Sequence, residues 1–126
     1  MARKRLNTAI MLSVVAGLIH LWFMPEHFRE WWGYGSFFLV TAIAQIGYGA
    51  VLFHAARRPA IILGIVGNLF VVGLYVLSRT IGVPLLGPHA GHVEALGVLD
   101  LTATLAEIGV VIALALLWRS PAARRR

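Results

Sequence analysis

The chain has 126 residues, of which 60% are hydrophobic and 13% are charged. A soluble domain carries roughly 25% charged residues, so this composition excludes a water-soluble globule and indicates a membrane protein. The absence of cysteine excludes disulfides, thiolate metal sites, iron–sulfur clusters and thiol catalysis. The net charge of +6 does not indicate nucleic-acid binding, because the basic residues flank apolar segments and form no stripe interleaved with exposed aromatic residues.

Four apolar segments occupy most of the chain, at 6–24, 36–56, 60–78 and 96–118. Each has about the 20 residues that a helix needs to cross a hydrocarbon core of ~30 Å. The sequence therefore predicts one all-α integral membrane domain, a four-helix transmembrane bundle with no room for a separate soluble domain. We expect the first helix to end at Pro25 and residues 25–35 to form a short outer loop, whose Trp and Tyr side chains lie at headgroup level.

The basic residues predict the orientation of the bundle. Nine of the eleven flank the apolar segments at three places, namely Arg3, Lys4, Arg5, Arg57, Arg58, Arg119, Arg124, Arg125 and Arg126. Lys and Arg are held on the cytoplasmic side during insertion, so both termini are expected in the cytoplasm. The expected location is a bacterial cytoplasmic (inner) membrane, with these residues beside anionic lipid headgroups on the cytoplasmic side.

Each predicted helix carries polar residues at helical spacing, which places them on one face. These sets are Ser13 and His20, then Thr41, Gln45 and Tyr48, then Asn68, Tyr75 and Arg79, and finally Asp100, Thr104 and Glu107. Polar residues inside membrane helices usually face the interior of the bundle. With the orientation above, Ser13, Gln45, Asn68 and Glu107 fall near the midplane. The residues expected nearer the outer end are His20, Thr41, Tyr75, Arg79 and Asp100. The pattern predicts a polar centre that opens outward.

Glu107 is the one acid in the middle of an apolar segment. Ionised there, it would cost about 2.5–3.5 kcal/mol on insertion scales. One interpretation is a proton- or cation-binding carboxylate positioned by Gln45 and Asn68, with Asp100, Tyr75 and Arg79 lining a ligand site above it. The alternative is a protonated glutamate whose hydrogen bond to Gln45 or Asn68 joins two helices.

The predicted outer side also collects imidazoles and carboxylates. These candidate metal ligands are His20, Glu26, His27, His89, His92 and Glu94. Imidazole and carboxylate together suit a divalent transition metal such as zinc, copper or iron. The alternative is a solvated acidic loop at residues 80–95, in which Glu94 or Asp100 pairs with Arg79.

Two stretches of the chain resemble a known group of proteins. They comprise Pro25, Glu26, His27, Trp31, Tyr34, Gly35, Phe37, Phe38 and Gln45, and then Gly67, Asn68, Tyr75, Ser78, Arg79, Thr80, Gly82, Pro84, Gly87, Pro88, Glu94, Gly97 and Asp100. Together they resemble an uncharacterised family of small four-pass integral membrane proteins from high-GC bacteria. The resemblance implies the same four-pass fold and no particular chemistry.

The sequence is compatible with three functions. The first is an outward-facing polar site that binds a metal ion, a proton or a small ligand. The second is a non-catalytic accessory subunit of a larger membrane complex, or a homo-oligomer, favoured by the row Ala9, Ser13 and Gly17 and by the glycines of segment 60–78. The third is a redox subunit that holds quinone or haem, although His20 and His54 lie roughly 20 Å apart along the membrane normal and cannot hold one haem between them. No hydrolytic or phosphate-binding motif is present, so the sequence favours a non-enzymatic function.

Overall fold

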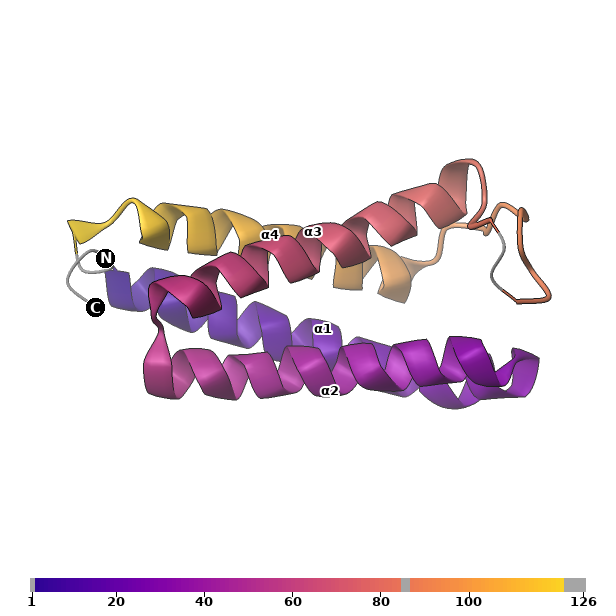
Figure 1. Ribbon diagram of the computed structural model, residues 1–126, viewed down its shortest axis with the longest axis horizontal. Helices are drawn as coiled ribbons and strands as arrows, with labels where there is room; N and C mark the ends of the chain where they lie inside the picture. The colour runs from indigo at the N-terminus through magenta and orange to yellow at the C-terminus, as the bar shows by residue number, and fades with distance from the viewer. Residues whose placement is uncertain (1, 85–86, 122–126) are drawn as a thin grey trace.

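The computed structural model describes residues 2–84 and 87–121, which contain four α-helices (Figure 1). Their bounds are α1 Ala2–Glu30, α2 Trp32–Ala55, α3 Arg58–Thr80 and α4 Val98–Trp118. All four helices are long and apolar enough to cross a membrane. The prediction of an all-α protein with four potential membrane-spanning helices is therefore confirmed.

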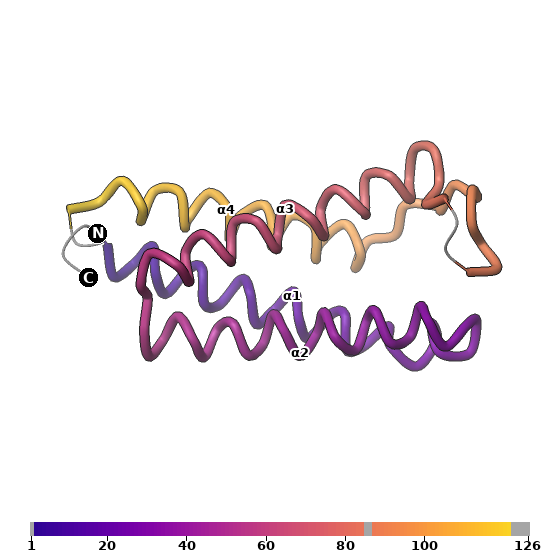
Figure 2. The backbone as a smooth tube through the Cα atoms, viewed as in Figure 1, coloured from indigo at the N-terminus to yellow at the C-terminus, as the bar shows by residue number. Residues whose placement is uncertain are grey.

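The helices form two hairpins that meet closely at one end only. α1 packs along α2 and also against α4, and α4 packs against α3, whereas α2 and α3 have little contact. Figures 1 and 2 show that the hairpins lie together near the chain termini and move apart toward the α1–α2 turn and the α3–α4 connection.

Small residues explain the close contact between α1 and α2. Ala9 and Ser13 are fully buried, and a Cβ on Gly17 would lie 2.7 Å from Cγ1 of Ile46. The Ser13 hydroxyl donates a hydrogen bond of 2.7 Å to the backbone carbonyl of Gln45 on α2. In lipid such close approach replaces the hydrophobic effect as the main source of helix association.

The hydrophobic core fills the end of the bundle that holds the termini. Its buried members are Ala9, Tyr48, Leu52, Ala56, Ile61, Val110, Ala113, Leu114 and Leu117. The outer faces of the helices are covered instead by exposed large apolar side chains, among them Ile43, Phe53, Leu63 and Phe70. Such surfaces suit hydrocarbon, because lipid tails are as apolar as these side chains.

The predicted cytoplasmic basic residues that the structure describes lie at this same end, whereas Arg29 and Arg79 lie in the last turns of α1 and α3 at the other end. Arg5 donates a hydrogen bond of 3.1 Å to the carbonyl of Leu116, so the start of α1 lies beside the end of α4. The guanidinium of Arg58 lies 5.1 Å above the ring centre of Trp118, which places the start of α3 there as well. Three of the predicted cytoplasmic arginines, at positions 124–126, lie outside the described residues.

The predicted end of the first helix is wrong. α1 continues through Pro25 to Glu30, and Trp31 alone separates it from α2. Proline removes one backbone hydrogen bond, a loss that neighbouring helices can offset in a membrane protein. Here the last turns of α1 are held by packing, since the His27 ring stacks on Phe38 of α2 with 3.8 Å between ring centres. The other predicted helix ends differ from the observed ones by at most four residues.

Candidate functional site

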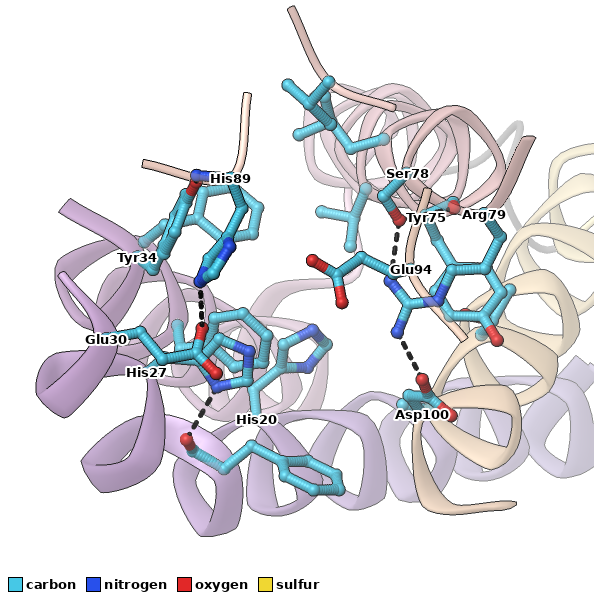
Figure 3. A pocket seen from close by; sticks show the side chains of 18 of the residues that line it. His20, His27, Glu30, Tyr34, Tyr75, Ser78, Arg79, His89, Glu94 and Asp100 are labelled. Atoms are coloured by element: carbon cyan, nitrogen blue, oxygen red, sulfur yellow. Dashed lines mark hydrogen bonds and ion pairs between the residues drawn. The ribbon is translucent and has the colours of Figure 1, made fainter. Parts of the chain in front are cut away.

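A cavity of about 420 Å³ lies between the two hairpins, at the end away from the termini (Figure 3). All four helices and the α3–α4 connection contribute to its wall. The lining is mainly apolar, with a few polar and charged groups among aromatic rings. This volume and this kind of lining are typical of binding sites for small molecules.

Nine of the twelve candidate site residues line this cavity. They are His20, His27, Tyr75, Arg79, His89, His92, Glu94, Asp100 and Glu107. The other three lie outside its lining: Gln45 hydrogen-bonds Glu107 from behind, Asn68 donates to the carbonyl of Gly64 in its own helix, and Glu26 is exposed. The polar faces of four separate helices thus converge on one space, together with the connection between α3 and α4.

Glu107 belongs to the deeper part of the cavity wall. It shares one face of α4 with Asp100 and Thr104, and its side chain is only 1% exposed. The Gln45 amide on α2 donates a hydrogen bond of 3.2 Å to its carboxyl group. One of the two predicted helix-to-helix bonds is therefore present, while the other is absent because Asn68 bonds within α3. The same carboxyl group also lines the cavity.

Arg79 and Asp100 form an ion pair across the cavity wall, joining the end of α3 to the first turn of α4. Arg79 also donates to the Ser78 hydroxyl at 2.7 Å, and its guanidinium lies 4.5 Å from the ring centre of Tyr75. Of the two partners predicted for Arg79, the structure has Asp100; the Glu94 side chain extends into the cavity instead (Figure 3). Among the described residues that line the cavity, Arg79 is the one Arg or Lys.

The α3–α4 connection is attached to the α1–α2 turn. The backbone N–H of His89 donates a hydrogen bond of 2.9 Å to the Tyr34 hydroxyl, and the two rings stack with 5.8 Å between centres. The His89 imidazole also lies 3.8 Å from the Glu30 carboxylate. Gly87 has a φ of +69°, and a Cβ there would lie 2.5 Å from the Trp31 ring. These contacts bring the connection over the cavity at the α1–α2 turn, as Figure 3 shows for His89, Tyr34 and Glu30.

Sequence reasoning missed several residues of the wall. Glu30 received no role, and Trp31 and Tyr34 were assigned to the headgroup region. The other aromatic members of the wall are Phe23, Phe37 and Phe38. Nothing in the sequence separates an inward phenylalanine from a lipid-facing one in a helix that is apolar on every side. The spacing of Phe38 to Thr41 and Gln45, three and seven residues on the same helical face, is the one available signal.

The described residues contain no group of three or more His, Asp or Glu side chains placed to hold a metal ion. Two of the predicted ligands are engaged within their own helix: Nδ1 of His20 is 2.8 Å from the Ala16 carbonyl, and Nδ1 of His27 is 2.9 Å from the Phe23 carbonyl. Binding of zinc, copper or iron by these residues stays a prediction.

Comparisons with protein families, with curated proteins and with solved structures find no match for this chain.

Proposed function

We propose that this chain is a multi-pass protein of the bacterial inner membrane that binds a small organic cation in the cavity between its hairpins. With both termini in the cytoplasm, as the basic residues predict, the cavity lies toward the outer face of the membrane. The observation that carries the proposal is the charge of the wall. Arg79 and Asp100 neutralise each other, and Glu30 lies beside the His89 imidazole. Glu94 and Glu107 are further lining carboxyl groups, and Arg79 is the one Arg or Lys in the described lining.

The aromatic rings of the wall support the same ligand class. Phe, Tyr and Trp faces attract ammonium groups, and this attraction grows when water is excluded. Six aromatic side chains line the cavity, which are Phe23, Trp31, Tyr34, Phe37, Phe38 and Tyr75. A wall that combines rings with carboxylates suits a cation with an apolar surface better than it suits an anion or a sugar.

Glu107 lies in the deeper part of the cavity wall, and its carboxyl group couples cation binding to the release of a proton. A carboxyl group that is 1% exposed is stable when it is protonated or when a cation lies beside it, because a lone buried charge is costly. Binding of a cation at Glu107 therefore displaces the proton. The Gln45 hydrogen bond fixes the carboxyl group in place for either partner.

Calorimetric titration of the purified protein in dodecyl maltoside with tetraphenylphosphonium tests the proposal. We expect saturable binding with proton release, which is measured by repeating the titration in buffers of different ionisation enthalpy. Triphenylphosphine oxide, which is similarly aromatic and uncharged, is the matched control and is expected to bind at least about tenfold more weakly. Equal binding of the two compounds would refute a cation site.

A metal ion is the competing ligand for the same end of the bundle. Elemental analysis of the purified protein, compared with a His89→Ala/His92→Ala variant, separates the two possibilities. Stoichiometric zinc, copper or iron that is lost in the variant would replace the organic cation as the conclusion.

A second candidate function, as an accessory subunit or homo-oligomer, is favoured by α3. Its buried residues are only Ile61, Gly64 and Asn68, and a Cβ at Gly67 or Gly73 would meet nothing within 4 Å in the described structure. Open glycines on a membrane helix let another helix approach closely. Chemical cross-linking in native membranes tests this role: a cross-linked species lost in a Gly67→Leu/Gly73→Leu variant supports it, and a monomer in both contradicts it.

A further inference from the structure

A second hollow adjoins the cavity on the outside of the bundle. It is a groove of about 250 Å³ lined entirely by apolar side chains, namely Val15, Leu18, Ile19, Trp22 and Leu99. Ile19 lines both the groove and the cavity. Leu99 directly precedes Asp100, which lines the cavity. The groove and the cavity are therefore neighbours, with the Ile19 side chain between them.

The groove faces the surroundings of the bundle within the membrane-spanning part of α1. Leu18 and Leu99 are exposed, and Trp22 is 74% exposed. Val15 and Trp22 are two helical turns apart, so the groove runs roughly 10 Å along α1. A groove with apolar walls at this depth is open to hydrocarbon chains and unsuited to a polar group.

The opposite approach to the cavity, from the aqueous side, is partly covered. The α3–α4 connection is attached to the α1–α2 turn through His89, Tyr34 and Glu30. A ligand that enters from water passes these contacts, whereas a ligand already in the bilayer meets the groove, which shares the aliphatic Ile19 side chain with the cavity.

We propose that the ligand is an amphiphilic organic cation whose ammonium headgroup binds in the cavity and whose alkyl chain lies in the groove between α1 and α4. This inference rests on the proposed function and names the ligand class and its route. The carboxylates and rings hold the charged head, and the apolar groove holds a chain that remains continuous with the bilayer. The ligand then reaches the cavity sideways, past Ile19.

Photochemical labelling tests this placement. The probe is dodecyltrimethylammonium with a diazirine at the end of its chain, added to the protein in phosphatidylglycerol liposomes, and labelled residues are located by mass spectrometry. We expect labelling at Trp22 and Leu99 to exceed that at Leu63 and Phe70 of α3 by about tenfold, and excess unlabelled dodecyltrimethylammonium to remove it. A dodecanol probe with the same diazirine is expected to label all lipid-facing helices alike.

Matched variants sharpen the result. Val15→Trp fills the groove and is expected to remove the labelling of Leu99, while Leu63→Trp, an equally lipid-facing change on α3, is expected to leave it unchanged. Identical patterns from the cationic and neutral probes, in a protein that binds tetraphenylphosphonium, would overturn the groove and leave the cation site standing. Failure of both cations to bind would overturn the proposed function itself.

Discussion

The Arg79–Asp100 ion pair adds no net charge to the cavity wall while it is intact, so breaking it from either side gives opposite predictions for a cation. Asp100→Asn leaves an uncompensated guanidinium in the wall and is expected to weaken binding of tetraphenylphosphonium. Arg79→Gln leaves an uncompensated carboxylate and is expected to strengthen it. The double variant removes both charges and is expected to restore an affinity close to that of the wild type.

The size of the effect follows from the size of the cavity. A sphere of about 420 Å³ has a radius of about 4.6 Å. Adding the radii of the atoms that fill the cavity and of the wall atoms places a charged group of the wall roughly 8 Å from a ligand at the centre. At an effective dielectric constant of about 20, a unit charge at that distance contributes about 2 kcal/mol, which is about 30-fold in affinity. Screening by salt reduces this value, so the titrations belong at low ionic strength.

Stability must be measured alongside affinity, because each single variant also breaks the pair. The Arg79 and Asp100 side chains are 20% and 23% exposed, so the pair lies between surface pairs and fully buried ones. We expect each single substitution to cost about 1–3 kcal/mol, and the double substitution to cost less than the sum. Calorimetric titration of folded protein separates the two effects. Affinity changes of the same sign in both single variants would show that charge does not govern binding and would refute the reasoning.

Three further changes test individual contacts. Glu107→Gln keeps the hydrogen bond from α2 and is expected to change the free energy of unfolding by less than about 1 kcal/mol, whereas Glu107→Leu is expected to cost about 1–3 kcal/mol. Helicity during SDS titration measures both changes. Equal losses of stability in the two variants would contradict the structural role of the bond. Gly64→Ala is expected to cost about 1–3 kcal/mol in the same assay, because its Cβ would lie 2.0 Å from the Tyr48 hydroxyl, and Gly67→Ala is the matched control without a neighbour. His89→Ala keeps the backbone N–H that bonds Tyr34 but removes the imidazole that stacks on Tyr34 and lies beside Glu30. It is expected to speed amide hydrogen exchange in the α3–α4 connection, and unchanged exchange would show that the backbone bond and other contacts hold it.

The helices could be predicted from the sequence, because a membrane-spanning helix makes its backbone hydrogen bonds internally and is recognised as an apolar segment of about 20 residues. The continuation of α1 past Pro25 could not be predicted from the sequence. A proline is a local stop signal, whereas the stacking of His27 on Phe38 depends on α2, which the local sequence does not reveal. The close contact at Gly17 was predictable, since small residues at four-residue spacing have few other uses in a helix of this kind.

The polar half of the cavity was predictable, and the apolar half was not. Residues such as Arg79 and Asp100 stand out in apolar helices, and their spacing brings them to one face. Phe23 carries no such mark, since Phe70 also has apolar residues on both sides and is exposed. The cavity itself arises because the hairpins move apart, and no helical period encodes that angle. Asn68 shows the remaining limit: it is buried, as expected for a polar residue in a membrane helix, but its side chain bonds to Gly64 and not to Glu107.

Glu107 lies on α4 at the boundary between residues that pack in the hydrophobic core and residues that line the cavity. Toward the termini, the same face continues with the buried apolar residues Val110 and Leu114 of the core, and away from them it continues with Thr104 and Asp100 of the cavity. One turn deeper, a carboxyl group would have neither the Gln45 amide nor access to the cavity. One turn outward, it would lie nearer to the ion pair of Asp100. The bond between helices and the proposed binding role are therefore compatible, because the carboxyl group that accepts the hydrogen bond from Gln45 also lines the cavity.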